Sequence, residues 1–457
     1  MPTNDDPGAR ICIDFGTATS KASLCLPERD GAPAADLVHP LQIGAVVDEA
    51  NPYLVQSALV FDREHERVFF GGRAMARARS GETASVPLVS FKTFLAARDL
   101  NDTLTSRLLR TIDITGRFQQ RDALVLYTAY LTRLVERAVL RDQRLHPRLL
   151  TRPRRFAYPR WRPGSAANVY LAGVFDQAAA IAAALGDALL DPAGVDLAAA
   201  RAALDAARTQ PGDGLIEGAV FEARAAAECH LAFGGETPEH VLVFDMGAGT
   251  TDITAVRRTP IGYKRHAWHE IEGLRATMAL ACDEVDRLMI ARFIERADSK
   301  RSKAALDRFW RRLSLHSRPL KEALFRDGFC EAEFEGRKIT LRSQDLFKDR
   351  TFVQFQRALA AAYQDALTRV ARTAAADGAD AIGVILAGGG SNLTFVQQMA
   401  RNTRPSVSRI RRIDLRPVVP SWAQGPDFDG AFRDIFPQIA ISIGGAVAAM
   451  TPMEFTV

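Results

Sequence analysis

The chain has 457 residues, 47% hydrophobic and 25% charged, which is ordinary globular composition and enough for two or three domains. The net charge of +5 is a mild basic excess that does not by itself indicate a nucleic-acid partner. The five cysteines show no regular spacing, which argues against a disulfide scaffold, and the polar, acidic N-terminus argues against a secretory signal. We find no apolar run of membrane-spanning length, so we expect a cytoplasmic protein.

The N-terminal part begins with a strand that runs into an acidic, glycine-containing turn. Residues 11–13 are apolar, and Asp14, Gly16, Thr17 and Ala18 follow. An apolar run with few charges indicates a buried strand, and glycine lets the backbone approach a ligand closely. Threonine hydroxyls and free amide groups bind phosphate oxygens, and an aspartate holds a hydrated cation. The turn therefore predicts a phosphate-binding loop.

Strands at 57–61 and 68–70 and a helix over 122–140 are expected next, followed by a basic segment. Residues 141–162 include eight arginines and three aromatic side chains. Arginine neutralises phosphates and aromatic rings stack on bases, so this segment suits a nucleic-acid contact. A strand at the edge of a lobe, leading into a turn at Pro159, is the simpler interpretation. We adopt it and expect no nucleic-acid partner.

An alanine-rich stretch at 166–209 is typical of a helical hairpin, and it is broken at 191–194 by Asp-Pro-Ala-Gly. Two interpretations stay open. The hairpin either fills space against the rest of the chain or docks a partner protein.

The second half of the chain repeats the pattern of a strand followed by an acidic turn. The apolar run 241–244 precedes Asp245, and the turn continues as Gly247-Ala248-Gly249-Thr250-Thr251-Asp252. A third loop, Gly388-Gly389-Gly390-Ser391-Asn392, follows a strand at 382–387. Two units of strand, Asp, Gly and Thr suggest a duplicated half, and their loops suggest two lobes that close on one nucleotide.

Other motifs exclude common alternatives. The chain has no Gly-x-x-x-x-Gly-Lys-Ser/Thr and no Gly-x-Gly-x-x-Gly opening a helix, which argues against P-loop and dinucleotide folds. His266 and His269 are three residues apart without further ligands nearby, so they do not indicate a metal site. The remaining expected elements are charged helices over about 275–325, a short β segment near 331–341, and helices over 352–376 and 439–450.

The order of the three loops resembles the actin, sugar kinase and heat-shock ATPase superfamily, with two phosphate loops and then an adenosine loop. Residues 221–234 and 441–449 resemble its two connecting helices, whose small residues suit a close crossing at a hinge. The resemblance covers Ile11 to Met450. It implies an α/β, two-lobed ribonuclease-H-like (actin-like ATPase) fold with an interlobe nucleotide cleft. The implied domains are lobe I at 8–235 with the insertion at 166–209, lobe II at 236–435, and a return helix and short tail at 436–457.

Residues 70–74 and 90–95 further resemble the segment that carries the catalytic lysine of the heat-shock protein 70 nucleotide-binding domain. The resemblance implies a Mg²⁺-dependent chaperone-type switch that binds ATP or ADP, hydrolyses ATP slowly and binds a protein partner or co-chaperone. It implies that Lys92 neutralises charge on the transferred phosphoryl group. Glu222 and Asp252 would orient or deprotonate water.

The resemblance thus assigns a full set of site residues. The implied Mg²⁺ ligands are Asp14 and Asp245. The implied catalytic residues are Lys92, Glu222, Thr250 and Asp252. The implied nucleotide-binding residues are Gly16, Thr17, Ala18, Gly247, Ala248, Gly249, Lys321, Gly388, Gly389, Gly390 and Asn392.

Some positions depart from the family pattern. Ala18 and Ala248 narrow the room for backbone approach, and Asn392 stands where the family has a stacking arginine. Phe325 replaces a serine on the adenine-facing helix, about 318–325. The chain stops at Val457, so we expect the family's client-binding module to be absent.

Two alternative functions stay open at this point. One is an actin-like filament protein whose nucleotide controls assembly, which nucleotide-dependent polymerisation would reveal. The other is a non-hydrolysing scaffold.

Overall fold

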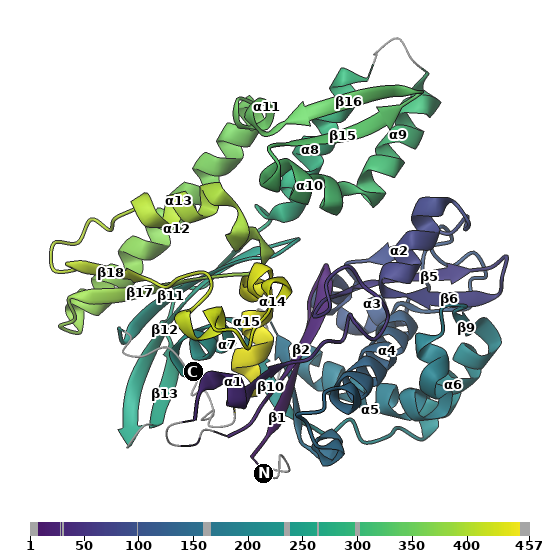
Figure 1. Cartoon of the computed structure of the whole chain (residues 1–457), viewed down its shortest axis with the longest axis horizontal. Coiled ribbons are helices and arrows are strands. Elements are labelled where there is room, and N and C mark those ends of the chain that lie inside the picture. The colour runs from purple at the N-terminus through teal and green to yellow at the C-terminus, as the bar shows by residue number, and fades with distance from the viewer. Residues whose placement is uncertain are drawn as a thin grey trace. The chain divides into compact units, whose positions relative to one another are not determined.

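The computed structural model describes residues 8–27, 29, 32–97, 99–158, 166–232, 238–262, 265–297 and 302–447. The chain divides into two compact units, and each mixes helices with mixed β-sheets (Figure 1). The predicted α/β class is therefore confirmed. Unit 1 comprises residues 1–236, 260–268 and 419–453, and unit 2 comprises 237–259, 269–418 and 454–457.

The main sheet of unit 1 has six strands in the order β10-β8-β1-β2-β3, with β4 paired to β2. Strands β1 and β2 form an antiparallel hairpin, whereas β1, β8 and β10 run parallel. The carboxyl ends of these three parallel strands therefore lie at one edge of the sheet. The bounds are β1 (Arg10–Phe15), β2 (Thr19–Cys25), β3 (Val38–Pro40), β4 (Val55–Gln56), β8 (Arg154–Tyr158) and β10 (Ile216–Phe221).

The second main sheet has the same strand order relative to the chain, β13-β12-β11-β17-β18, with β14 paired to β12. Strands β11 and β12 are antiparallel, and β11, β17 and β18 are parallel. This repetition agrees with the duplicated half that the sequence suggests. The bounds are β11 (His240–Met246), β12 (Thr251–Gly262), β13 (Arg265–Glu270), β14 (Ala276–Met278), β17 (Ala381–Ala387) and β18 (Arg412–Leu415).

A smaller sheet and most of the helices complete unit 1. The smaller sheet has the order β7-β5-β6-β9. Its strands are β5 (Ala58–Asp62), β6 (Arg67–Phe70), β7 (Leu88–Val89) and β9 (Val195–Asp196). The helices of this unit are α1 (Ala34–Leu37), α2 (Gly71–Ser80), η1 (Phe91–Ala96), α3 (Leu100–Thr105), α4 (Gln120–Arg141), η2 (Pro147–Thr151), α5 (Ala166–Leu185), η3 (Gly186–Leu190), α6 (Leu197–Thr209), α7 (Glu222–Ala232), η5 (Ser421–Gln424), α14 (Gly430–Asp434) and α15 (Phe436–Ala446).

Helices α7 and α15 cross closely within unit 1, as their small residues predict. A Cβ atom added to Gly444 would lie 1.7 Å from the carbonyl oxygen of Ala225, and one added to Gly445 would lie 2.4 Å from Cys12 Sγ. Glycine is therefore required where α15 lies against α7 and β1.

The alanine-rich insertion is bound to α4 by ion pairs. The Asp122 carboxylate is fully buried and pairs with Arg208 at 2.7 Å and with Arg201 at 3.2 Å. Rings of Phe156 and Phe175 stack with centroids 5.6 Å apart, which joins α5 to the main sheet. These contacts favour the interpretation that the insertion fills space as part of the unit 1 core.

The insertion also corrects the expectation that no segment reaches membrane-spanning length. The segment Ala166–Leu190 is long and apolar enough by length and composition, with a mean hydropathy of 1.5 and 33% of its most apolar window buried. Asp176 and Asp187 interrupt the sequence, but alanine and leucine keep the average high. One such helix is weak evidence for a membrane span, and α5 packs against α4 and α6 through the part of its surface that is buried.

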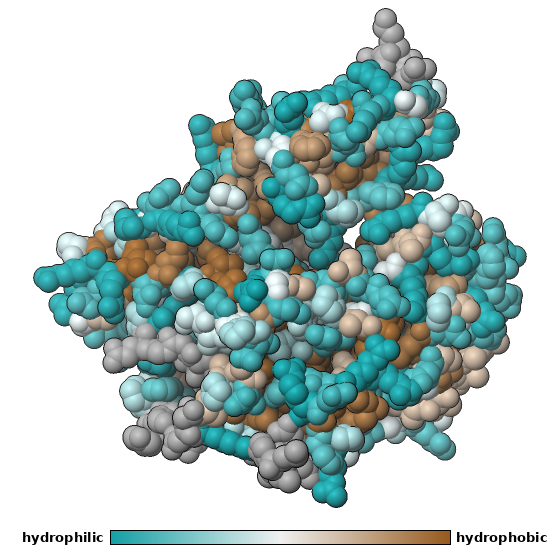
Figure 2. Space-filling model, in the orientation of Figure 1, coloured by the Kyte–Doolittle hydropathy of each residue, from teal (hydrophilic) through white to brown (hydrophobic). Residues whose placement is uncertain are grey.

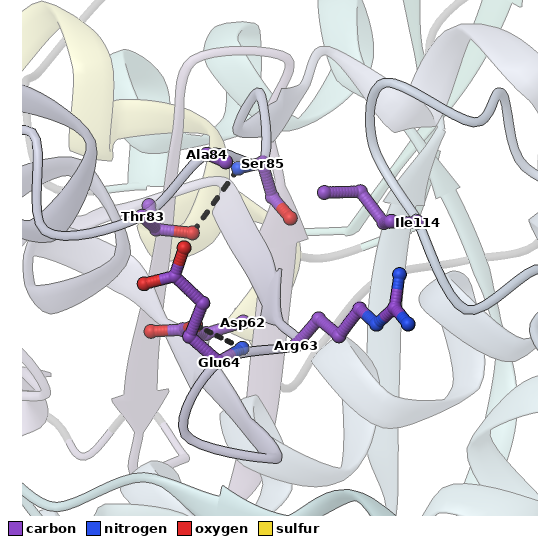
Figure 3. A pocket seen from close by; sticks show the side chains of 7 residues that line it. All are labelled: Asp62, Arg63, Glu64, Thr83, Ala84, Ser85 and Ile114. Carbon is purple, nitrogen blue, oxygen red and sulfur yellow. Dashed lines mark hydrogen bonds between the residues drawn. The ribbon is translucent and has the colours of Figure 1, made fainter.

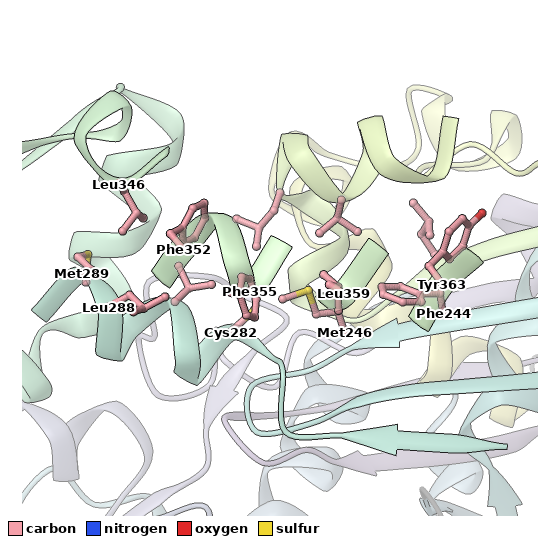
Figure 4. Close-up of a cluster of buried hydrophobic side chains, with 14 of the residues drawn as sticks. Phe244, Met246, Cys282, Leu288, Met289, Leu346, Phe352, Phe355, Leu359 and Tyr363 are labelled. Carbon is pink, nitrogen blue, oxygen red and sulfur yellow. The ribbon is translucent and has the colours of Figure 1, made fainter. Parts of the chain in front are cut away.

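Unit 2 has its own apolar core, in which α12 packs against β11 and α8 (Figure 4). Phe244 and Met246 of β11 contribute to this cluster, so the strand that carries Asp245 is anchored on both sides of that residue. A two-stranded sheet, β15 (Phe329–Phe334) with β16 (Arg337–Arg342), belongs to the same unit. The helices are α8 (Cys282–Arg296), α9 (Lys303–Leu315), α10 (Ser317–Arg326), α11 (Ser343–Phe347), α12 (Arg350–Ala376), η4 (Gly389–Asn392) and α13 (Thr394–Asn402).

Candidate functional site

The first predicted phosphate loop joins β1 to β2 and turns tightly. A Cβ atom on Gly16 would lie 2.2 Å from the carbonyl oxygen of Thr19, so no larger residue fits this turn. Thr17 is half-buried, and Ala18 is exposed at the tip of the loop. The predicted loop residues are therefore adjacent and partly accessible.

Ser57, which the sequence analysis missed, lies between β4 and β5 and binds this loop. Its hydroxyl donates to the Gly16 carbonyl oxygen at 2.8 Å, and its amide donates to the Ala18 carbonyl oxygen at 2.9 Å. The Tyr127 hydroxyl donates to Ser20 Oγ at 3.2 Å, and Ser20 Oγ lies 3.0 Å from Ser57 Oγ. This buried network fixes the loop backbone in place.

Asp14 is paired with a lysine that the sequence analysis also missed. Lys21 lies opposite Asp14 in the β1–β2 register, and its Nζ lies 2.8 Å from Asp14 Oδ2. Asp14 is 2% exposed and Lys21 is 8% exposed. The pair is detectable from the sequence once the hairpin register is fixed, because the pairing of residues 15 and 20 brings 14 and 21 together.

Lys92 and Glu222 form a second ion pair in unit 1. Lys92 Nζ donates to Glu222 Oε1 at 2.8 Å, and Lys92 is 8% exposed. Phe91 fixes the position of Lys92, because its ring lies 5.4 Å from that of Phe15 on β1 and 4.9 Å from that of Tyr127. Lys92 is thus not an ordinary surface lysine.

Glu222 begins α7 directly after β10, so it stands at the same sheet edge as the loop after β1. Unit 1 therefore brings Asp14, Gly16, Thr17, Ala18, Lys92 and Glu222 to one edge. Pro159 lies outside the described residues, as do Phe233, Gly234 and 448–449 of the two predicted connecting helices, and Met450 at the end of the predicted helix 439–450.

Several arginines in the described part of the basic segment, 141–158, make contacts within unit 1. Arg154 is 5% exposed, and burial lowers the pKa of its guanidinium. Arg155 pairs with Glu217 at 2.6 Å and donates to the Val447 carbonyl oxygen at 2.8 Å. These contacts fit the interpretation of a structural strand.

The second predicted phosphate loop joins β11 to β12 in unit 2. The Gly247 amide donates to the Thr250 carbonyl oxygen at 2.9 Å, which closes the turn. The first amides of α8 brace it, because Cys282 N donates to Gly247 O at 3.2 Å and Asp283 N donates to Ala248 O at 2.8 Å. Gly249 is partly buried and Thr250 is exposed.

Asp252 is held by two hydroxyl groups. Thr250 Oγ1 donates to Asp252 Oδ2 at 2.9 Å, and Thr277 Oγ1 donates to Asp252 Oδ1. Asp252 lies opposite Asp245 in the β11–β12 register. Thr277 is a further residue that sequence reasoning missed, because it comes from β14, whose pairing the sequence does not reveal.

The third loop contacts Asp245 directly. Strands β11 and β17 are parallel with Asp245 beside Ala387, so both loops leave the same sheet edge. Gly388 has φ +76°, and a Cβ atom there would lie 2.3 Å from Asp245 Oδ1. A Cβ atom on Gly390 would lie 2.3 Å from Met246 Cγ. Gly389 is partly buried, and Asn392 is exposed at the end of η4.

Lys321 reaches the base of the second loop. Its Nζ donates to Asp286 Oδ2 at 3.0 Å and to the Cys282 carbonyl oxygen at 3.4 Å. Burial raises the pKa of the Asp286 carboxyl, with Lys321 opposing that shift. Phe325, one turn further along α10, lies against Phe347 and Phe395 with ring centroids 6.2 and 6.5 Å apart. Its ring is thus used in packing.

The oxygen donors of the two loops differ in how well they suit Mg²⁺. In unit 2, Asp245 and Asp252 are aligned across a hairpin with threonine hydroxyls nearby, and such hard oxygen ligands fit a hydrated Mg²⁺. Asp14 fits less well, because the Lys21 ammonium already neutralises it. Within the part of the chain that the structure describes, no group of three or more His, Cys, Asp or Glu side chains is arranged to hold a metal.

Two other features of unit 1 lie apart from the predicted site. A cavity of about 310 Å³ is lined by Asp62, Arg63, Glu64, Thr83, Ala84, Ser85 and Ile114, none of which is a predicted site residue (Figure 3). The five cysteines, in both units, are buried and unbridged, as expected.

Comparison of the chain with protein-family models found no match. Comparison with curated proteins also found none.

Proposed function

We propose that the protein is a Mg²⁺-dependent, ATP-binding and slowly hydrolysing molecular switch with the two-lobed actin-like ATPase fold. In this proposal each compact unit is one lobe, and a single nucleotide binds to the loops of both. The observation that best supports this proposal is that both main sheets have the same strand order. In each sheet a loop with Asp, Gly and Thr follows the first strand. Such a repeated arrangement suits a ligand with several phosphates.

The loops supply backbone amides and hydroxyls for phosphate oxygens. Gly16, Gly247 and Gly388 stand at tight turns or close approaches where a Cβ atom would lie within 3.3 Å of the neighbouring backbone or side chain. Mg²⁺ would be held through Asp245, and it would offset the negative charge of the phosphates. Asp14 would hold the Lys21 ammonium beside the first loop, where it could donate a hydrogen bond to a phosphate oxygen.

Hydrolysis in this proposal depends on the buried Lys92–Glu222 pair and on Asp252. Glu222 would accept a proton from, or orient, the attacking water, and Lys92 would stabilise charge on the transferred phosphoryl group. The two threonine hydroxyls that bind Asp252 fix the direction of its carboxylate. Pairing of Lys92 with Glu222 at 2.8 Å lowers the charge that either presents, which fits slow turnover.

A second candidate is a nucleotide-binding protein that does not hydrolyse ATP. The Asp14–Lys21 ion pair favours it, because a neutralised Asp14 is a weaker ligand for a metal-bound water. Turnover measurements decide between the two.

The test combines binding with turnover on the full chain. A fluorescent ATP analogue should bind in the presence of Mg²⁺, and phosphate release should be slow but above background. Asp245→Asn should weaken binding, whereas Asp365→Asn, at an exposed carboxylate on α12, should not. Absence of nucleotide binding in the wild-type chain would refute the proposal, and binding without phosphate release would favour the second candidate.

A further inference from the structure

Helix α9 of unit 2 presents an unusual outer face. Its inner face is buried through Ala305, Phe309 and Leu313. On the outer side the Trp310 indole is 55% exposed. Exposed tryptophan is uncommon on a folded surface and is enriched in protein interfaces. In Figure 2 hydrophilic side chains predominate over the region that Figure 1 labels α9, β15 and β16.

The same face carries positive charges that the described part of the chain leaves without ion pairs. Lys303, Arg308 and Arg311 are exposed, and no ion pair of theirs occurs among the described residues. The guanidinium of Arg312 lies 5.5 Å from the Phe309 ring centroid. Asp307 is the single acidic residue of α9; it is exposed on this face, four residues before Arg311, and no ion pair of it occurs among the described residues. From 308 to 321 the sequence contains no Asp or Glu.

The arginines of the neighbouring helix α8, unlike those of α9, form ion pairs within their own helix. On α8, Arg287 pairs with Glu284 at 2.5 Å and Arg292 pairs with Glu295 at 2.7 Å. Such pairs three residues apart are a routine way to balance charge on a helix. No such pair occurs on α9 among the described residues, and Lys303, Arg308 and Arg311 outnumber Asp307, so its outer face is net positive beside an exposed indole.

We propose that the outer face of α9 binds an acidic amphipathic helix of a partner protein. Its carboxylates would pair with Arg308 and Arg311, and an aliphatic side chain would pack on Trp310. At 100° per residue, Arg311 lies near the middle of the exposed face, with Arg308 on one side and Trp310 on the other. The footprint is therefore about 10 Å wide, the width of one helix.

Charge and shape favour this partner over two other anionic ones. Proteins that bind single-stranded nucleic acid use a basic groove lined with several stacking aromatic rings, whereas α9 is convex and has one exposed indole. Helices that bind membrane surfaces insert a broad apolar face, whereas the apolar face of α9 is buried in unit 2.

The experiment measures binding of a fluorescently labelled synthetic helical peptide, with glutamates along one side and leucines along the other, to the full chain. Binding should weaken with salt. Arg308→Glu/Arg311→Glu should weaken it about tenfold or more, and Trp310→Ala should weaken it by a similar factor. Labelled oligothymidylate and phosphatidylserine vesicles serve as competing probes.

Matched controls come from the same unit. Arg357→Glu/Arg401→Glu changes two exposed arginines on α12 and α13, and Phe329→Ala removes another exposed aromatic ring. These controls should leave peptide binding unchanged. Failure of the peptide to bind at low salt, equal effects of test and control variants, or tighter binding of oligothymidylate or vesicles through the same residues would each overturn the proposal. Nucleotide binding is measured in parallel, so the outcome does not depend on the proposed ATPase activity.

Discussion

Lys21 lies directly opposite Asp14 across the β1–β2 hairpin, and the two charged groups are 2.8 Å apart. The equivalent residue of the β11–β12 hairpin is Asp252, opposite Asp245. The two hairpins therefore share one register but differ in charge. Because Lys21 neutralises Asp14, we propose Asp245 as the metal ligand, and the β1–β2 hairpin contributes a lysine beside the first loop.

Removing the lysine should reveal how strongly Asp14 depends on it. Lys21→Met leaves a buried carboxylate without its partner and should lower the free energy of unfolding by about 3 kcal/mol. Asp14→Asn/Lys21→Met removes both charges and should recover most of that loss. Urea unfolding followed by circular dichroism measures both variants. A change of under about 0.5 kcal/mol in Lys21→Met would show that water solvates Asp14 well enough by itself.

The Lys92–Glu222 pair should matter more for turnover than for nucleotide binding. Lys92→Ala removes a positive charge that is proposed to act in the transition state, so phosphate release should fall about 100-fold while nucleotide affinity changes less than about threefold. Lys348→Ala, at an exposed lysine, is the control. Unchanged turnover in Lys92→Ala and Glu222→Gln would remove both residues from the mechanism.

The Asp252 carboxylate should depend on its hydroxyl neighbours for orientation. Thr277→Val keeps the shape of the side chain but removes the hydroxyl that binds Asp252. We expect Thr277→Val to lower the rate of phosphate release about tenfold, which is less than the loss expected when a proton-transfer group is removed. Thr340→Val is a suitable comparison, because Thr340 binds Glu331 on the separate β15–β16 sheet. Equal turnover in the two variants would contradict a role for Thr277.

Much of this site follows from the sequence because it depends on short-range pattern. Local features of this kind are the strands before Asp14 and Asp245, the turn glycines and the helix that begins at Glu222. Their order along the chain predicts which loops lie at the same sheet edge. The Lys92–Glu222 contact is different, since 130 residues separate the partners. Only the resemblance placed these residues in one site.

Other residues were missed for identifiable physical reasons. Ser57 lies between β4 and β5 and Thr277 lies on β14, and no local pattern specifies how these strands pair. The sequence suggests that Phe325 departs from the family at a base-binding position. In the structure its ring packs on Phe347 of α11 and Phe395 of α13, which are distant from it in the sequence. Tertiary packing decides such cases, and a single sequence contains little information about it.

His39 should make unit 1 sensitive to acid. Burial, together with the Arg144 charge, lowers the pKa of His39 to about 4, although Asp142 and Asp36 oppose the shift. A histidine with a lowered folded-state pKa is neutral in the folded protein, so its stabilising contribution is complete above about pH 6.5, where the unfolded chain is also neutral. This contribution is lost as the pH falls from about 6.5 to about 4, and it amounts to about 3 kcal/mol.

Urea unfolding at several pH values tests this expectation. His39→Phe keeps an aromatic ring but cannot be protonated, so it should lose less stability than the wild-type chain between neutral pH and pH about 4. His316→Gln, at a half-buried position at the end of α9, should give the same pH profile as the wild-type chain. Parallel pH profiles for wild type and His39→Phe would mean that water reaches the imidazole and solvates its charge.

The crossing of α7 and α15 gives the sharpest steric prediction, because two glycines in unit 1 differ only in their surroundings. A Cβ atom on Gly444 would lie 1.7 Å from the Ala225 carbonyl oxygen, whereas one on Gly173, inside α5, would meet nothing within 4 Å. Gly444→Ala must push the helices apart and should cost about 3 kcal/mol. Gly173→Ala should stabilise the protein by up to about 1 kcal/mol, because alanine favours the helix. Thermal unfolding measures both, and a Gly444→Ala variant as stable as Gly173→Ala would mean that the two helices separate without loss of packing.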